Sequence, residues 1–343
     1  MTNQHQHRCT HMNADKHETA HRLLCTHNRT RRFAAVSVAL LLALTLTGCG
    51  SVPFKGKHPK AASDMGSHQS LYDGKDDAAF ATALPVTSAP EAIARGDMAM
   101  ASGDLDKALF EYIRALEVDD GNADALYKIG LIHTMRGNAP LAEVAFRGAL
   151  AKDPGNAGAL TGLGVALLKR RAYDEARAHL ERAVAIAPGI AKAHNALGVI
   201  ADLNRDYKAA QGHYQRALDA TPGSPSLLNN LGYSRYLGGN WDGAVSAFRE
   251  ALLADPSYER AWRNLALVYA RQERYADAVD ALSKVQDMPK AYNDVGYLAM
   301  VDGKLDKAED FFEEAKRSSP AFYALADTNQ RRVALMQGDA AAP

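Results

Sequence analysis

The chain has 343 residues, of which 40 are basic and 40 acidic, so its formal net charge is zero. A nucleic-acid-binding protein presents a strongly basic surface, and this balance gives no sign of one. With 47% hydrophobic residues and only three cysteines, the chain must be held together by packing rather than by a disulfide framework.

The first informative segment lies near the N-terminus. Three arginines within residues 29–32 precede an apolar run over residues 33–46, which is shorter than the roughly 20 residues that span a bilayer. Such a basic and then apolar segment is typical of a secretory signal. The next residues, 46–49 (LTGC), resemble the lipobox of bacterial lipoproteins, in which the cysteine is acylated and becomes the mature N-terminus. We therefore expect residues 1–48 to be a signal peptide and Cys49 to be the lipidation site.

This processing defines the expected location and charge of the mature protein. The removed segment carries six basic and two acidic residues, which leaves 34 basic and 38 acidic residues. Cys49 would be the one remaining cysteine, so no intramolecular disulfide could form. By resemblance to sorted lipoproteins of Gram-negative bacteria, Gly50 after that cysteine favours the periplasmic face of the outer membrane. Acyl chains would anchor the protein there.

The segment after the lipidated cysteine shows no periodicity. It is rich in Ser, Pro, Lys, Asp and Gly and has few large apolar residues. We expect residues 49–88 to form a flexible linker, with a reach on the order of 35 Å for a coil of this length.

From residue 89 onward, small residues recur every 34 positions. A period of this length indicates stacked supersecondary units that bury their apolar faces against one another. Within each unit, apolar residues follow helical steps on both sides of a short polar break, which predicts two helices joined by a turn, and a proline ends the second helix. The four recurring sets are Gly96, Gly130, Gly164, Gly198 and Gly232; Ala108, Ala142, Ala176, Ala210, Ala244 and Ala278; Ala115, Ala149, Ala183, Ala217 and Ala251; and Pro154, Pro188, Pro222 and Pro256.

This pattern resembles the tetratricopeptide repeat family. The resemblance implies an all-α fold, an α-solenoid forming a right-handed superhelix of about seven helix hairpins over residues 89–322. The sixth unit has Ala266 where the others have glycine and is four residues short, so we expect a shortened second helix there. Residues 323–343 are expected to form a capping helix and a disordered tail, and the predicted apolar stripe of that cap consists of Phe322, Leu325, Ala326, Val333 and Met336.

Family resemblance also implies a concave groove lined by the first helix of each unit. Amide, tyrosine and arginine side chains there would suit an extended peptide or its carboxylate, and the arginines suggest an acidic or C-terminal segment. Each could equally be a hydrated helix face. The groove residues are Lys192, Asn195, Asp202, Asn229, Tyr233, Tyr236, Arg260, Arg263, Arg271, Lys290, Asn293 and Tyr297.

No arrangement typical of catalysis is found in the mature sequence. Gly158, Gly162 and Gly164 suggest a nucleotide-binding loop only superficially, because they fall inside a predicted helix with no strand before them. His133, His179, His194 and His213 are expected at different repeat positions, as packing or surface residues. We therefore expect a non-enzyme without metal or other cofactor.

Two asparagine-rich stretches, 229–233 (NNLGY) and 292–297 (YNDVGY), together with the lipobox, make the chain similar to the TadD-like lipoproteins of tight-adherence (Flp) pilus assembly. That resemblance implies a scaffold whose partners belong to a pilus or secretion apparatus, with the secretin as a candidate. Two other repeat-lipoprotein classes remain as alternatives: a type IV pilus pilotin for secretin assembly, and an NlpI-like adaptor for peptidoglycan hydrolases.

Overall fold

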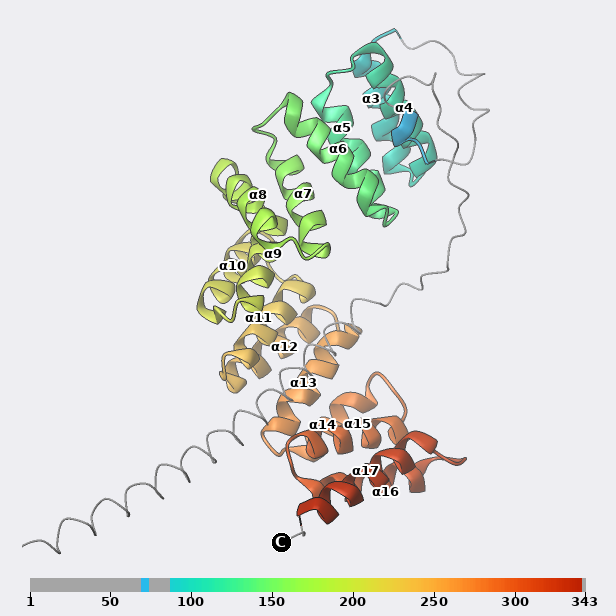
Figure 1. Ribbon diagram of the computed structural model, residues 1–343, viewed down its shortest axis with the longest axis vertical. Coiled ribbons are helices and arrows are strands. Elements are labelled where there is room, and N and C mark those ends of the chain that lie inside the picture. Colours follow the sequence, from blue (N-terminus) through green and yellow to red (C-terminus); the bar gives the residue numbers. More distant parts are fainter. Residues whose placement is uncertain (1–68, 74–86, 341–343) are drawn as a thin grey trace, which may run out of the picture. The chain divides into compact units, whose positions relative to one another are not determined.

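The computed structural model describes residues 69–73 and 87–340. The predicted signal peptide, Cys49 and most of the predicted linker lie outside these ranges. Within them the chain forms one short 3-10 helix and fifteen α-helices, with no strand (Figure 1). None of these helices is both long and apolar enough to cross a membrane. The elements are η1 (Gln69–Leu71), α3 (Ala89–Ala101), α4 (Leu105–Val118), α5 (Ala123–Met135), α6 (Ala139–Lys152), α7 (Ala157–Lys169), α8 (Tyr173–Ile186), α9 (Ala191–Leu203), α10 (Tyr207–Ala220), α11 (Pro225–Leu237), α12 (Trp241–Ala254), α13 (Glu259–Arg271), α14 (Tyr275–Ser283), α15 (Met288–Val301), α16 (Leu305–Ser318) and α17 (Ala324–Ala340).

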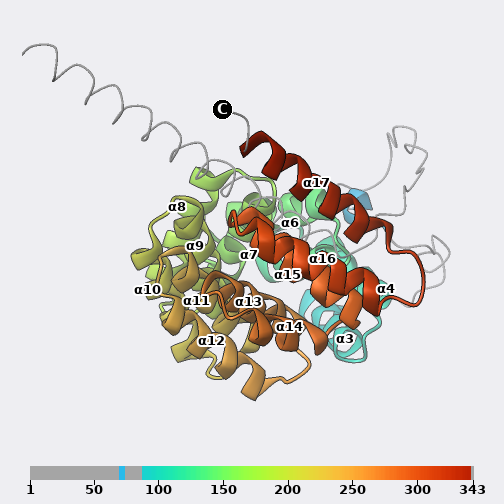
Figure 2. The same ribbon diagram turned by 90° about the horizontal axis from the view of Figure 1, so that it is seen from below.

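The helices form seven hairpins, from α3 with α4 to α15 with α16. The second helix of each hairpin packs against the first helix of the next, and the first helices of neighbouring hairpins also touch from α5 onward. The last helix, α17, lies along α16 and reaches α15 (Figure 2). The predicted all-α solenoid of seven hairpins with a further C-terminal helix is confirmed.

Turn chemistry explains where many of the helices begin. The side chain of Asn122 accepts a hydrogen bond from the backbone N–H of Ala125 at 2.9 Å, and Asn156 accepts one from Ala159 at 2.8 Å. Such N-caps satisfy a backbone donor that the first helical turn leaves without a partner. Because Asn122 and Asn156 stand 34 residues apart, the same capping signal starts the first helix in two successive hairpins.

Every hairpin also turns through one residue with a left-handed backbone. Glycine adopts this conformation without strain, whereas a side chain makes it unfavourable. Four hairpins use glycine, and three use arginine or glutamate. The seven residues are Gly103, Gly137, Arg171, Arg205, Gly239, Glu273 and Gly303, with φ between 58° and 82°.

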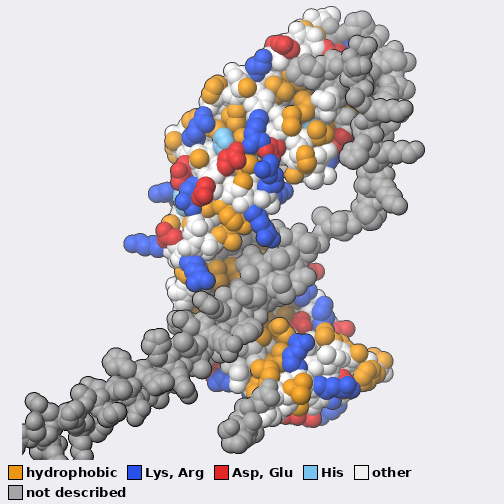
Figure 3. Space-filling model, viewed as in Figure 1, with side chains coloured by type: hydrophobic (Ala, Val, Ile, Leu, Met, Phe, Trp, Pro, Cys, Tyr) orange, Lys and Arg blue, Asp and Glu red, His pale blue; other side chains and the backbone are white. Residues whose placement is uncertain are grey.

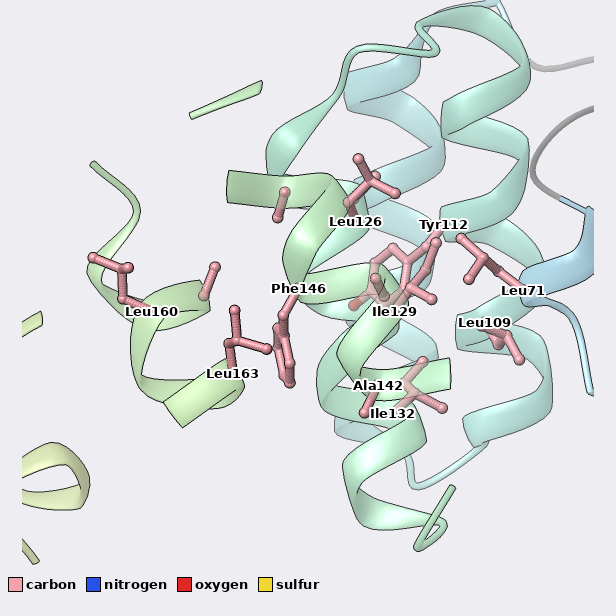
Figure 4. Close-up of a cluster of buried hydrophobic side chains, with 14 of the residues drawn as sticks. Leu71, Leu109, Tyr112, Leu126, Ile129, Ile132, Ala142, Phe146, Leu160 and Leu163 are labelled. Atoms are coloured by element: carbon pink, nitrogen blue, oxygen red, sulfur yellow. The ribbon is translucent and has the colours of Figure 1, made fainter. Parts of the chain in front are cut away.

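Most of the periodic glycines of the first helices pack against rings of the second helices, whereas Gly164 packs against Leu180. A Cβ atom added at Gly130 would lie 2.5 Å from the ring of Phe146, and one added at Gly232 would lie 2.7 Å from Phe248. Both rings are fully buried, and Figure 4 shows Phe146 between helices in the core. Glycine is therefore required for the two helices to approach each other around an aromatic ring.

The sixth hairpin departs from this arrangement as its sequence predicts. Its second helix, α14, has nine residues, whereas the second helices of the other hairpins have 14. Ala266 replaces the glycine and Leu282 replaces the ring, and both are buried. In this hairpin, the methyl group of Ala266 on the first helix thus accompanies leucine, which is smaller than an aromatic ring, on the second.

The predicted apolar stripe of the C-terminal helix is only partly right. Ala326 and Val333 are fully buried, but Phe322, Leu325 and Met336 are 77%, 52% and 41% exposed. Phe322 lies two residues before the start of α17. Within α17, Leu325 and Met336 lie beside a narrow face whose buried residues recur at helical spacing. That face contains Asn329, which is buried and donates a hydrogen bond to Asn293 of α15.

Part of the predicted flexible linker packs on the array. Leu71 of η1 belongs to the same buried cluster as the helices of the first hairpins, and Tyr72 is packed against that cluster. The described residues 69–73 therefore differ from the expectation of a free coil.

Candidate functional site

Asparagine side chains link the first helices of consecutive hairpins. Nδ2 of Asn230 in α11 donates to Oδ1 of Asn195 in α9 at 2.8 Å, and Nδ2 of Asn264 in α13 donates to Oδ1 of Asn229 in α11 at 2.8 Å. A third pair joins α17 to α15, where Asn329 donates to Asn293 at 3.0 Å. We call these three pairs the amide row: Asn195–Asn230, Asn229–Asn264 and Asn293–Asn329.

The amide row has unused hydrogen-bonding capacity. Each pair uses one N–H and one carbonyl oxygen, although an asparagine amide has two N–H donors and two acceptor lone pairs. Asn229 and Asn293 are buried, so they serve mainly to join hairpins. Asn195, Asn230 and Asn264 are only partly buried, so their remaining donors and acceptors can reach a ligand.

The row is interrupted where the short sixth hairpin joins the seventh. Arg263 stands in α13 at the repeat position of Asn229, and it donates to Oε1 of Gln286 at 3.0 Å. Gln286 in turn donates to Asp294 of α15 at 2.9 Å. A bridging glutamine thus replaces a direct amide pair, and Arg263 also lies 3.6 Å from Glu259.

Arg271 is held by two neighbouring first helices. Its Nε donates to the Tyr236 hydroxyl in α11 at 3.1 Å, and its guanidinium forms an ion pair with Asp302, just after α15. Burial opposes the positive charge of Arg271, but Tyr236 and Asp302 outweigh it and raise the pKa of Arg271. Burial also raises the pKa of Asp302, although the nearby Arg271 acts to lower it. Arg271 is therefore already compensated, which reduces its availability for an acidic ligand.

The other predicted residues fall into two groups. The Tyr233 ring lies 6.0 Å from the Tyr236 ring, so these two tyrosines and Arg271 form one cluster beside the amide row. Within the described ranges, no hydrogen bond joins Lys192, Lys290 or Tyr297 to another predicted groove residue. Lys192, Lys290 and Arg260 are exposed, and Tyr297 is partly buried.

Asp202 holds two hairpins together. It accepts hydrogen bonds from the Tyr214 hydroxyl at 2.8 Å and the Ser234 hydroxyl at 2.6 Å. Burial raises the pKa of Asp202 to about 6, although both hydrogen bonds oppose that shift. Two hydrogen-bond donors from different hairpins indicate that this carboxyl group is mainly structural.

The prediction from sequence missed the donor half of the amide row. Asn230 and Asn264 occupy the position after the predicted groove asparagines, one repeat further on, whereas Asn329 lies in α17, 36 residues after Asn293. The signal was available, since Asn230 follows Asn195, and Asn264 follows Asn229, by 35 residues. One period plus one residue places the two amides on adjacent helices.

The histidines also differ from expectation. His179 and His213 lie 34 residues apart and so share one repeat position, contrary to the prediction. Nδ1 of His213 lies 3.2 Å from Nδ1 of buried His194, and Nε2 of His194 donates to the Pro188 carbonyl at 2.9 Å. Trp262 makes the matching bond to a proline carbonyl two hairpins later. Among the described residues, no three His, Cys, Asp or Glu side chains gather as a metal site requires.

Charge is distributed over the surface with both signs present. On the face seen in Figure 3, Lys and Arg are interspersed with Asp and Glu, so hydrogen bonding and shape rather than a uniform field would select a ligand there.

Comparison with solved structures defines the class of fold. A tetratricopeptide repeat protein from Parabacteroides merdae is 17% identical over 73% of this chain and 100% of its own, with a TM-score of 0.51. The Cut9–Hcn1 hetero-tetramer of the APC/C is 18% identical over 69% of this chain and 48% of that one, with a TM-score of 0.53. The molecule is thus an α-helical repeat solenoid.

The family follows from sequence profiles. Two profiles, both described as Tetratricopeptide repeat, match this chain, one over residues 93–157 and 229–289 and the other over residues 133–200. The chain is a tetratricopeptide repeat protein. No curated protein matches it in sequence.

Proposed function

We propose that this protein is a non-catalytic scaffold that binds extended segments of other proteins along its first helices. The observation that carries this proposal is the amide row. Tetratricopeptide repeats are typical of protein–protein interaction scaffolds, and three inter-helix amide pairs give the array a repeated set of polar groups.

The spacing of the row suits an extended backbone. Packed helices lie about 10 Å apart, and an extended chain rises about 3.3 Å per residue, so successive amide pairs would meet about every third residue. A peptide backbone offers alternating N–H and C=O groups, which match the donor and acceptor atoms of an asparagine amide. Tyr233, which is partly exposed, would then contact side chains of the bound segment, and buried Tyr236 would support its ring.

We propose further that the scaffold is anchored to the outer membrane through Cys49 and serves in assembly of a Flp pilus or its secretion apparatus. The lipobox and the similarity to TadD-like lipoproteins support this role. The candidate partner is a segment of the secretin. Cys49→Ala should release the protein from the membrane fraction, and recovery of the variant with membranes would contradict the anchor.

Binding to tiled peptides tests the scaffold. Overlapping peptides that cover the secretin and other pilus-assembly proteins are measured by fluorescence anisotropy against the mature chain. Asn264→Ala should weaken the tightest peptide by at least about tenfold, because it removes a half-buried amide of the row. Asn122→Ala is the matched control, since it removes an N-cap of similar energetic value, about 1 kcal/mol, away from the row. Equal affinities of the two variants would contradict the proposal.

A further inference from the structure

A second, separate binding site lies at the N-terminal end of the array, where residues from outside the repeats are bound. We call Leu71–Asp73 the latch and the surface it occupies the latch site. The latch site comprises Leu109 of α4, His133 of α5, Arg136 after α5, and Asn138 before α6. These residues come from the first two hairpins, whereas the amide row begins at α9.

The latch is anchored first by an apolar side chain. Leu71 is only 4% exposed and points toward Leu109 and Tyr112 (Figure 4). Its carbonyl oxygen accepts a hydrogen bond from Nε2 of His133 at 2.8 Å, and His133 is fully buried. The histidine therefore recognises the backbone of the latch inside the core.

A second anchor is ionic. Asp73 accepts hydrogen bonds from Arg136 at 2.5 Å and from Nδ2 of Asn138 at 3.0 Å, and its other contact is Nδ1 of His133 at 3.5 Å. Burial opposes the negative charge, but Asn138, His133 and Arg136 together lower the pKa of Asp73. The site thus combines an apolar slot, a backbone donor and a carboxylate-binding pair, which together specify a short peptide.

The later hairpins satisfy the corresponding groups differently. One repeat after His133 stands Leu167, which is fully buried and needs no hydrogen-bond partner. Arg136 forms one ion pair inside the array, with Asp106 of α4, and its counterpart one repeat later, Arg170, forms one with Glu143. Arg136 differs in forming a second ion pair, with Asp73 of the latch. His133 and Arg136, which bind residues outside the repeats, therefore distinguish the first two hairpins from the hairpin that follows.

We propose that the latch site is a peptide-binding site for a short segment with leucine two residues before aspartate, and that the chain's own latch fills it in cis. The latch is joined to α3 by residues 74–88, and a connection of that length keeps a tethered ligand at an effective concentration in the millimolar range. A weak site is then occupied until the latch is released. In a lipid-anchored protein the latch would also shorten the free tether, a consequence that rests on the proposed anchoring.

The test compares an occupied with a vacated site. The full mature chain is prepared as wild type and as the released variant Leu71→Ala/Asp73→Ala, whose changes lie outside α3–α17. A fluorescein-labelled peptide of residues 67–75 is titrated into each by anisotropy. We expect the released variant to bind it at least about tenfold more tightly, because cis occupancy multiplies the apparent Kd of the wild type. Two controls should abolish binding: the same peptide with Asp73→Lys, and Arg136→Ala in the released variant.

Two outcomes overturn the proposal. Equal binding to wild type and released variant would mean that the latch does not occupy the site. No binding to the released variant at millimolar peptide would mean that the site does not recognise the segment. Chymotrypsin cleavage after Tyr72 provides a second readout that needs no added peptide: it should be at least tenfold faster in the released variant, and an unchanged rate contradicts the latch. Both readouts are independent of the amide row.

Discussion

Replacing Gly232 with alanine should destabilise the fifth hairpin, although alanine is ordinarily the better helix former. Gly232 lies within α11, and a Cβ atom there would meet three ring atoms of Phe248 at 2.7, 2.9 and 3.1 Å. Ordinary carbon contacts begin near 3.5 Å, so the ring or the helix must move. The ring is fully buried, so it can move only by displacing the groups packed around it.

The magnitude follows from two opposing terms. Overpacking a core typically costs about 1–3 kcal/mol. Alanine in place of glycine within a helix contributes about 1 kcal/mol in the other direction. The net change should therefore be a loss of up to about 2 kcal/mol. Gly212→Ala in α10 is the matched control, because nothing lies within 4 Å of a Cβ there, and it should stabilise the protein by about 0.5–1 kcal/mol.

The sixth hairpin supplies a test of the cause. There, Ala266 accompanies Leu282 in place of the ring. In a double-mutant cycle, Gly232→Ala should therefore cost less in a Phe248→Leu background, with a favourable coupling of about 1–2 kcal/mol. Native-state hydrogen exchange of α11 and α12 amides is the appropriate assay, because repeat arrays can unfold in parts. The reasoning is refuted if Gly232→Ala stabilises the hairpin as much as Gly212→Ala does.

Three further predictions concern strain and pH. Arg205→Gly should raise the urea midpoint, since it removes a left-handed non-glycine residue that costs about 1 kcal/mol, and an unchanged or lower midpoint would contradict this. Burial raises the pKa of Asp202 from 3.8 to about 6, so the folded state favours the protonated carboxyl group. The contribution of Asp202 to the free energy of unfolding is therefore largest below pH 3.8 and is lost as the pH rises through 6. Asp202→Asn should remove that component from the stability difference between pH 4.5 and 7.5. Burial lowers the pKa of His133, so the free energy of unfolding should fall as the pH drops below about 6.5. His133→Gln should make stability less dependent on pH in this range, as measured by urea titrations that follow helicity.

The fold was predictable because its determinants are local and repeated. The 34-residue spacing of Gly130 and its counterparts records a contact with a ring 16 residues later, and this contact recurs in several hairpins. The short sixth unit was visible as a break in the period, and α14 is short as a result. Errors arose where an element has no repeat to constrain it. In α17, helical periodicity alone could not reveal that Asn329 pairs with Asn293 and fixes the buried face.

The candidate site was predictable only in part. Family positions identified Asn195, Asn229 and Asn293, which all lie in the amide row. They could not show that Arg271 is paired with Asp302 in the next hairpin, because that ion pair depends on how two helices are offset. The latch was missed for a similar reason: a three-residue segment has no periodicity, and its hydrogen bonds are to side chains more than 60 residues away.

Side-chain amide NMR tests the proposed peptide binding most directly. The asparagine NH₂ signals of the mature chain are assigned and followed during titration with the tightest of the tiled peptides. The signals of Asn195, Asn230 and Asn264 should shift in proportion to occupancy, while that of the capping residue Asn122 stays in place. Saturating peptide that leaves the three row signals unmoved would contradict binding along the amide row.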